Sequence, residues 1–329
     1  MPNSRILGIG HYVPPRVLTN HDLEALMDTS DEWIRQRTGI EERRIVEPGV
    51  PTSELALHAS RRALEDAGLS AGDLDLIVVA TLSPDFYFPG VGVLLQDKLG
   101  AGEIPALDIR QQCSGFVYGL SIADQFIRTG TYQRVLLVGA EVQSAGLDYS
   151  TRGRDLAVIF GDGAAAVVLG PSEEEGVISV HLHSQGKYHD MLWLEKPGSE
   201  SSPTITPEDL EEGRHFPRME GQTVFKHATK RFAESIQEVL AHNRITAEDV
   251  DLFFFHQANL RIIDAISKMV GIPPEKTFNN LQRYGNTTAA SIPLCMSEAY
   301  QRGVLKRGQL VCPVAFGSGF TWGSALIRW

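Results

Sequence analysis

Cys113 is the residue whose surroundings most strongly suggest chemistry. Residues 105–109 have the composition of a short buried strand, and Cys113 opens a stretch with apolar residues every three or four positions that Gly130 ends. We therefore place Cys113 at a strand-to-helix turn, where free amide N–H groups and the helix dipole favour the nucleophilic thiolate. The alternative is a small buried core residue, which is common for a free cysteine.

Two polar residues in the second half of the chain are candidate partners for this cysteine. His256 and Gln257 directly follow three phenylalanines, which is typical of a site at the carboxyl end of a buried parallel strand. Asn286 lies in a glycine-containing turn before a segment rich in small residues, where a helix-capping role is the alternative. The glycine-rich stretch 315–323 can turn several backbone N–H groups toward one point and so form an oxyanion hole.

A cysteine, a histidine and an asparagine serve two classes of enzyme. In a cysteine hydrolase the histidine is the general base and the asparagine orients it. In a carbon–carbon condensing enzyme both residues donate hydrogen bonds to a thioester oxygen and stabilise the enolate left when a malonyl group loses carbon dioxide. The chain lacks the papain-type cysteine signature. It also contains an internal repeat, which favours condensation because two facing turns can serve two substrates.

The segments that must position these residues contain an internal repeat. Residues 69–79 resemble residues 245–255 at a constant offset of 176 positions (245 minus 69), and residues 160–164 resemble residues 316–320. Alternating helix and strand patterns predict largely parallel α/β sheets. We expect two similar halves, residues 1–173 with the cysteine and residues 174–329 with the histidine and asparagine. The turns around Cys113 and Asn286 would then face each other, with His256 between them.

Residues 184–217 interrupt this alternation. They include several serines, prolines and acidic residues, and Thr206 followed by Pro207 is typical of a helix start. The stretch is either a solvated surface excursion or a lid over a substrate entrance.

Composition and charge exclude several other functions. A net charge of −11 argues against a general nucleic-acid binder. No apolar run has membrane-spanning length and residues 1–10 do not resemble a secretory signal, so we expect a cytoplasmic protein that does not bind membranes. The three cysteines, Cys113, Cys295 and Cys312, lack zinc-binding spacing, and we expect reduced thiols, the last two in the core, and no metal site.

An ordered set of motifs resembles the β-ketoacyl-acyl-carrier-protein synthase III family of the thiolase-like superfamily, from Leu7 to the C-terminus. Each motif alone is modest evidence, whereas the whole set in this order is specific. The motifs are TSDEWI at 29–34, RTGI at 37–40, CSGF at 113–116, FGDGA at 160–164, HQAN at 256–259, GNT at 285–287 and FGSGFTW at 316–322.

The resemblance implies a five-layered α-β-α-β-α fold of two duplicated halves and a ping-pong acyltransferase reaction. Cys113 would accept the acyl group of an acyl-coenzyme A, after which malonyl-acyl-carrier protein would enter. His256 and Asn286 would promote decarboxylation, and the carbanion would attack the Cys113 thioester to give 3-oxoacyl-acyl-carrier protein, which initiates fatty acid synthesis. The backbone N–H groups of Cys113 and Ser318 would form the oxyanion hole. No cofactor is implied.

The resemblance also implies binding residues for coenzyme A and its pantetheine arm. Trp33 and Arg154 would clamp the adenine at the mouth of a tunnel, with Arg37 beside them, and Asn259 would contact the pantetheine. Arg152 competes for the role of Arg154, which we prefer because its spacing to the FGDGA motif fits without a gap.

Partner contacts are implied in the same way. Lys226, Arg261 and Gln257 resemble carrier-protein docking residues, and a local basic patch of this kind would reconcile an acidic enzyme with an acidic partner. Phe88 falls where the partner subunit of a homodimer closes the acyl pocket in the family.

The chain departs from the family pattern at a few positions, so the resemblance does not determine which acyl starter is used. Gln111 and Gln112 replace small residues before the cysteine, and Ser318 stands where a third glycine is usual. One alternative is therefore a related condensing enzyme or acyltransferase of secondary metabolism with an unusual starter or acceptor. A second is a non-catalytic partner subunit, which the retained cysteine, histidine and asparagine argue against.

Overall fold

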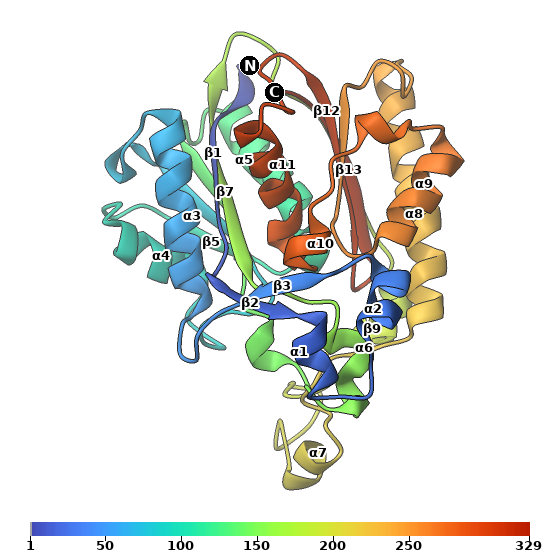
Figure 1. Ribbon diagram of the computed structural model, residues 1–329. Helices are drawn as coiled ribbons and strands as arrows, with labels where there is room; N and C mark the ends of the chain where they lie inside the picture. The colour runs from blue at the N-terminus through green and yellow to red at the C-terminus, as the bar shows by residue number, and fades with distance from the viewer. Residues whose placement is uncertain (1) are drawn as a thin grey trace.

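The computed structural model describes residues 2–329, whose helices and sheets form five layers (Figure 1). Two outer helix layers cover two sheets, and a third helix layer separates the sheets. From left to right in Figure 1 the helix layers contain α3 (Thr52–Ala67) and α4 (Val91–Leu99), then α5 (Gly115–Arg128) and α11 (Ser291–Gln301), then α8 (Gly221–Asn243) and α9 (Leu260–Val270). This is the α-β-α-β-α arrangement that the resemblance predicted.

The two sheets lie between these helix layers. The first has the strand order β1-β7-β6-β4-β5 and the second the order β11-β12-β13-β8. The strands of the first are β1 (Asn3–Tyr12), β4 (Leu76–Ala80), β5 (Ala106–Ile109), β6 (Val135–Glu141) and β7 (Gly163–Ser172). Those of the second are β8 (Val177–Ser184), β11 (Leu252–Phe255), β12 (Leu310–Gly317) and β13 (Thr321–Arg328).

Both sheets repeat one pairing pattern. In the first, β4 and β6 are parallel, whereas β6 with β7 and β7 with β1 are antiparallel. In the second, β11 and β12 are parallel, whereas β12 with β13 and β13 with β8 are antiparallel. The edge strand β5 has as its counterpart only an isolated bridge between Phe253 and Thr277. The predicted boundary at 173/174, which stays a prediction, lies in the link between β7 and β8.

The repeated sequence produces a repeated local structure. Ser70 donates its backbone N–H and its hydroxyl to the Asp73 carboxylate at 2.8 and 2.7 Å. Thr246 does the same with Asp249 at 2.8 and 2.9 Å. These capped turns lead the chain into β4 and β11 in the same way, so that Ala80, the last residue of β4, corresponds to His256, the first residue after β11.

The sheets are mixed, and the prediction of largely parallel sheets was wrong in this respect. Residues 318–320 alone join β12 to β13, and so short a turn can connect only antiparallel strands. The first sheet has the same strand directions although a longer link joins β6 to β7. Sequence patterns identified most strands of the two sheets, though not β8, and carried no information about this reversal.

Three large apolar clusters fill the spaces between the layers. One lies between α3, α4 and the first sheet, one surrounds α5 and α11, and one lies between the second sheet and α8 with α9. Cys295 and Cys312 are fully buried in these clusters, as predicted. Within residues 2–329, no helix is both long and apolar enough to cross a membrane.

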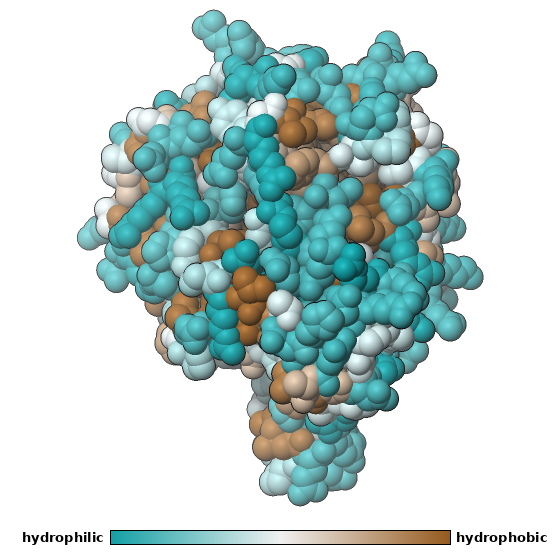
Figure 2. All heavy atoms as spheres, in the orientation of Figure 1, coloured by the Kyte–Doolittle hydropathy of each residue, from teal (hydrophilic) through white to brown (hydrophobic). Residues whose placement is uncertain are grey.

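Shorter elements surround the open end of the layers. They are β2 (Arg16–Thr19), α1 (Asn20–Glu24), α2 (Asp31–Thr38), β3 (Glu42–Ile45), α6 (Arg154–Ala157), β9 (Leu192–Trp193), α7 (Pro207–Glu211), β10 (Arg218–Met219) and α10 (Leu281–Tyr284). The excursion 184–217 projects as an arm that carries α7 at the bottom of Figures 1 and 2. Thr206 caps α7 with a capping box, which confirms the predicted helix start.

Candidate active site

Cys113 lies between the two sheets, in the turn that starts the central helix α5. The chain leaves β5, forms the short turn η2 (Gln112–Ser114) and continues directly into α5. The cysteine is only 6% exposed. Gly115 is required here because a Cβ at this position would lie 2.9 Å from the Cβ of Ala80 and 3.2 Å from that of Ala289. The predicted strand, turn and helix are therefore confirmed, but the prediction that this strand is buried is wrong, because β5 lies at the edge of its sheet with Leu107 and Asp108 exposed.

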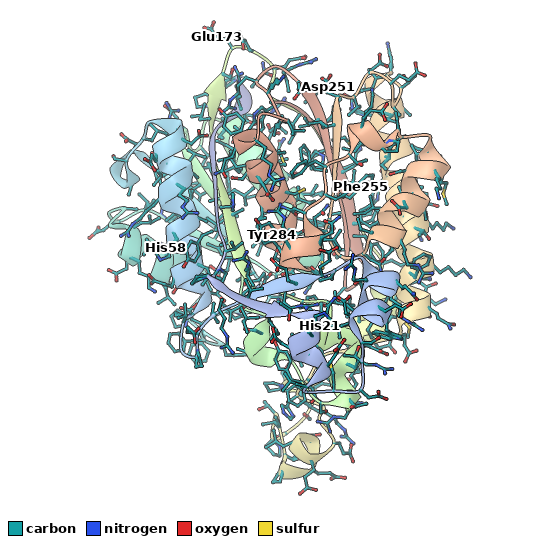
Figure 3. The ribbon with its side chains drawn as sticks, in the orientation of Figure 1. His21, His58, Glu173, Asp251, Phe255 and Tyr284 are labelled. Atoms are coloured by element: carbon teal, nitrogen blue, oxygen red, sulfur yellow. The ribbon has the colours of Figure 1, made fainter. Side chains whose placement is uncertain are left out.

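His256 and Asn286 reach the same point from the second half. His256 follows β11 and donates its backbone N–H to Val314 at 2.9 Å. Phe255 and Tyr284, labelled in Figure 3, lie in the interior just before the histidine and just before the Gly285–Asn286 turn. Asn286 accepts a hydrogen bond on Oδ1 from the Thr288 N–H at 2.8 Å, so its amide Nδ2 is left to face Cys113 as a donor.

One pocket brings the three residues together. Cys113, His256 and Asn286 line it with Asn259 and Gly317. The remaining lining is almost wholly apolar and includes Leu156, Phe160, Leu192, Met219, Val224, Phe225, Ala228, Phe232, Ile262 and Phe316. An apolar channel with a few convergent polar groups at its end suits a long, thin substrate arm that carries its reactive group at the tip. Leu192 belongs to the excursion 184–217 and Met219 follows it directly, so the base of the excursion forms part of the wall.

Burial sets the protonation of the two ionisable groups in this pocket. Burial and the nearby Glu141 carboxylate raise the pKa of the Cys113 thiol to about 12. The prediction that the helix start favours a thiolate is thus wrong for the free protein, because loss of water outweighs the amide groups. Burial likewise lowers the pKa of His256 to about 3. Both side chains are therefore neutral near pH 7.

The glycine-rich turn after β12 passes directly beside the cysteine. A Cβ at Gly317 would lie 3.0 Å from both the backbone nitrogen and the Cβ of Cys113, so only glycine allows this approach. The turn is held by a 2.6 Å hydrogen bond between the hydroxyls of Ser114 and Thr321 and by a bond from the Ser318 hydroxyl to the Leu192 carbonyl. Ser318 itself is half-buried and follows the pocket-lining Gly317.

Trp33, Arg37, Arg154 and Asn259 form a second group, which the structure also brings together. The Trp33 ring has the Arg37 guanidinium 4.6 Å from its centroid and the Arg154 guanidinium at 4.7 Å. Asn259 caps α9 and donates its side-chain amide to the Arg37 carbonyl at 3.0 Å. Arg152 instead bonds Asp148 at 2.7 Å, which favours the choice of Arg154.

The three predicted docking residues divide into two kinds. Lys226 and Arg261 are exposed, and the Arg261 guanidinium lies 5.9 Å from the centroid of Phe225, which lines the pocket. Gln257, in contrast, is 1% exposed, and its side chain bonds the Phe255 carbonyl at 2.8 Å and the Asn280 N–H at 3.0 Å. The docking role predicted for Gln257 is therefore wrong, because a side chain enclosed in this way cannot meet a partner protein.

Phe88 does not line the pocket of its own chain. It is 81% exposed beside Phe86 at 59% and Tyr87 at 73%. This aromatic loop and Leu107 of the edge strand β5, 38% exposed, leave apolar surface uncovered. Large exposed apolar patches mark surfaces that contact other proteins.

Sequence reasoning missed two buried polar residues that support the site. Glu141 ends β6 and accepts hydrogen bonds from the Ser83 hydroxyl at 2.5 Å and the Gln143 amide at 3.1 Å. Ser291 begins α11, and its hydroxyl lies 2.7 Å from Nδ1 of His256. The signal for Glu141 was a charged residue at the end of an apolar strand, whereas a serine at a helix start is too common to stand out. Within residues 2–329, no group of three or more His, Cys, Asp or Glu side chains is placed to hold a metal.

Comparisons with known proteins agree with this geometry. The family described as 3-oxoacyl-[acyl-carrier-protein (ACP)] synthase III matches residues 107–186, and its C-terminal counterpart matches residues 240–329. The chain is 47% identical to the β-ketoacyl-[acyl-carrier-protein] synthase III of Alkalilimnicola ehrlichii, and the alignment covers all of both chains. It is 46% identical to the protein of the same name from Caldanaerobacter subterraneus, covering 98% of this chain and 97% of the relative.

A solved structure shows the same fold. The 3-oxoacyl-[acyl-carrier-protein] synthase III of Aquifex aeolicus matches this structure with a TM-score of 0.91 at 42% identity, covering 99% of this chain and 100% of that one. Similarity at this level extends over both halves and therefore includes the strands and turns that carry the pocket.

Proposed function

We infer the roles of the site residues from the premise that this chain belongs to the β-ketoacyl-[acyl-carrier-protein] synthase III family. The enzyme is an acyltransferase that condenses an acyl-coenzyme A starter with malonyl-acyl-carrier protein to give 3-oxoacyl-acyl-carrier protein, which initiates fatty acid synthesis. The convergence of Cys113, His256 and Asn286 at the end of one apolar pocket supports their assignment as its catalytic residues.

In the first step Cys113 is the nucleophile. Its sulfur forms a bond to the acyl carbonyl carbon, the bond from that carbon to the coenzyme A sulfur breaks, and the thiol proton leaves with coenzyme A. The carbonyl oxygen carries negative charge in the transition state. The backbone N–H groups of Cys113 and Ser318 are our candidates for the oxyanion hole, and the close passage of Gly317 beside Cys113 supports this assignment.

In the second step His256 and Asn286 act on malonyl-acyl-carrier protein. The bond between the malonyl methylene carbon and the carboxylate breaks, carbon dioxide leaves, and the electron pair moves toward the thioester oxygen. A neutral imidazole N–H and the Asn286 amide donate hydrogen bonds to that oxygen. The carbanion then attacks the Cys113 thioester and releases the cysteine as a thiolate, which takes up a proton from water. This route uses the two thioester substrates and no cofactor.

The mouth of the pocket is our proposed coenzyme A site. Arg37 and Arg154 both lie against the Trp33 ring, and Arg154 also donates to the Asp28 carbonyl at 2.7 Å. At 4.7 Å from the ring centroid the Arg154 guanidinium is in contact with the indole. Arg154 therefore has to move before an adenine can stack between the two side chains. Asn259, which lines the pocket below, would contact the pantetheine.

Partner binding completes the proposal. Lys226 and Arg261 would receive the acidic carrier protein at the pocket rim. The aromatic loop Phe86–Tyr87–Phe88 and the edge strand β5 would pair with a second copy in a homodimer, so that Phe88 closes the acyl pocket of the partner. We also propose a cytoplasmic location, where coenzyme A and carrier-protein substrates are made.

Intact-protein mass spectrometry tests these roles. The protein is mixed with a panel of acyl-coenzyme A esters, with Cys113→Ala as the control. We expect one acyl mass on the wild type only, and its discharge as a 3-oxoacyl product when malonyl-acyl-carrier protein is added. Transfer of the acyl group to water or to another acceptor would instead indicate the alternative, a divergent acyltransferase of secondary metabolism.

A further inference from the structure

The hydroxyl of Ser291 is the one side-chain partner of His256 in this structure. Its oxygen lies 2.7 Å from Nδ1 of the imidazole and also accepts the Gln257 backbone N–H at 3.3 Å. Ser291 is 1% exposed and His256 is 4% exposed, so water does not compete for these bonds. Because Nδ1 is occupied by Ser291, Nε2 is the ring nitrogen left for the substrate pocket that His256 lines.

Counting hydrogens fixes which ring nitrogen carries the proton. A serine hydroxyl has one proton to donate, and the Gln257 N–H already occupies an acceptor position on its oxygen. Across residues 2–329, the hydroxyl has no hydrogen-bond partner other than this N–H and the imidazole. All groups are satisfied only if Ser291 donates to Nδ1, which places the imidazole proton on Nε2.

We propose that Ser291 is a positioning residue that holds His256 in the tautomer with its proton on Nε2. This proposal rests on the proposed function and explains how one histidine serves only the second step. A protonated Nε2 donates a hydrogen bond to the oxygen of the enolate as carbon dioxide leaves, without transferring the proton. The same nitrogen then has no lone pair with which to take the proton of Cys113, so His256 is not a general base for acyl loading.

The internal repeat supports this pairing independently. At the offset of 176 positions, His256 corresponds to Ala80 and Ser291 corresponds to Gly115. The repeated fold therefore forms without either polar side chain. The imidazole and the hydroxyl that orients it occur together in one half and are both missing from the other, as expected for two residues with one task.

The test separates the two half-reactions in the full-length protein with Ser291→Ala and Ser291→Thr. Acyl loading is followed by intact mass, and decarboxylation by carbon dioxide release from malonyl-acyl-carrier protein. We expect Ser291→Ala to load Cys113 within about twofold of the wild-type rate and to decarboxylate at least about tenfold more slowly, as when a group that orients a catalytic imidazole is removed. Ser291→Thr keeps the hydroxyl and should restore most of the decarboxylation.

Ser297→Ala is the matched control. Ser297 lies on the same helix, is fully buried, and bonds a histidine in the same way, with its Oγ 2.8 Å from Nδ1 of His11. His11 does not line the pocket. Removal of this hydroxyl should leave the ratio of the two half-reaction rates unchanged. The variant therefore controls for any general effect of losing a buried serine–histidine hydrogen bond.

Nitrogen NMR of ¹⁵N-histidine-labelled wild-type protein reads the tautomer directly, even if Ser291→Ala does not fold. A proton on Nε2 of His256 supports the proposal, whereas a proton on Nδ1 overturns it. Equal losses of loading and decarboxylation in Ser291→Ala, or no loss of decarboxylation, would also overturn it. A wild-type protein that neither loads an acyl group nor releases carbon dioxide would contradict the proposed function instead, so the two failures are distinguishable.

Discussion

Gln112 and Thr288 lie 176 positions apart and share a left-handed backbone conformation, with φ angles of 44° and 45°. Each begins a short turn that runs into a central helix, α5 or α11. This conformation is unfavourable for residues with a Cβ, so the surrounding structure must hold it in both halves. The turns are therefore matched, and the counterpart of Cys113 is Ala289. The fold contains this turn twice, and only the copy in the first half carries the cysteine nucleophile.

The Glu141 carboxylate should restrain the reactivity of Cys113. Burial raises the pKa of Glu141 to about 7, and its negative charge raises that of the thiol. As the pH rises from 6 to 8, Glu141 ionises and opposes thiolate formation, so the rate of Cys113 alkylation by iodoacetamide should rise less than tenfold per pH unit. Glu141→Gln should react several-fold faster at pH 8, because one pKa unit is about tenfold in thiolate.

The alkylation rate of Glu141→Gln should also rise by the full tenfold per pH unit. Asp162→Asn, which removes a buried carboxylate that does not act on Cys113, is the control. Identical pH profiles for the wild type and Glu141→Gln would contradict this prediction.

Decarboxylation should not depend on titration of His256. The pKa of His256 is about 3 in the folded protein, compared with 6.5 for an imidazole exposed to water. The imidazole therefore stays neutral from pH 5 to 8. The pH profile of carbon dioxide release from malonyl-acyl-carrier protein should therefore show no inflection near pH 6.5 that comes from His256. Any inflection found there in the wild type should also be present in His256→Gln. The unfolded chain binds the extra proton below pH 6.5, so this residue should lower the free energy of unfolding as the pH falls toward 3.

Acid denaturation can test the sign of this effect. The wild type should lose stability between pH 6.5 and 3 more steeply than His256→Gln, measured by denaturant unfolding at each pH. A wild type that gains stability over this range relative to the variant would show that the imidazole is charged in the folded protein.

Arg154 should contribute to binding of the nucleotide end of coenzyme A. Arg154→Ala removes the guanidinium that we expect to stack on the adenine opposite Trp33 and should raise KM for acyl-coenzyme A about fivefold, corresponding to about 1 kcal/mol. The corresponding acyl-pantetheine, which lacks the nucleotide, should be used with unchanged KM. Arg152→Ala is the matched control because Arg152 is bound to Asp148 instead. An equal effect of Arg154→Ala on both substrates would place its role elsewhere.

Arg261 should contribute to binding of malonyl-acyl-carrier protein and should not contribute to loading of the acyl starter. Arg261→Glu reverses an exposed charge at the pocket rim and should raise KM for malonyl-acyl-carrier protein about three- to tenfold, with weaker dependence on salt. Lys268→Glu makes the same charge change farther along α9 and should have little effect. Acyl loading from coenzyme A should be unchanged in both variants, and a defect in loading would argue against a docking role.

Phe88 should support assembly of two chains. Phe88→Asp introduces a charge into the exposed aromatic loop and should weaken the dimer at least about 30-fold, as expected for loss of a central aromatic contact. Light scattering after size-exclusion chromatography over a dilution series measures this. Leu194→Asp, at an exposed leucine on the excursion, is the control. A wild-type protein that is monomeric at micromolar concentration would refute the homodimer.

The sequence by itself determined two duplicated α/β halves and the position of the candidate catalytic residues, and the family resemblance of its motifs implied the five-layered arrangement. The two halves and the positions depend on local patterns: apolar runs, helix starts and stops, and a repeat with a constant offset of 176 residues. Because the two halves resemble each other, the turns of Cys113 and Asn286 had to meet, and the shared pocket confirms this meeting. The chemical roles of these residues stay predictions.

Tertiary structure alone decided the chemistry of the surroundings. The thiol is protonated rather than ionised, Gln257 is enclosed rather than available to a partner, and Ser291 rather than Cys113 is bonded to His256. The reversal of strand direction in each sheet was likewise decided by the tertiary structure. These properties depend on which distant segments exclude water from a group and which donors they bring to it, and neither is encoded in the spacing of residues along the chain.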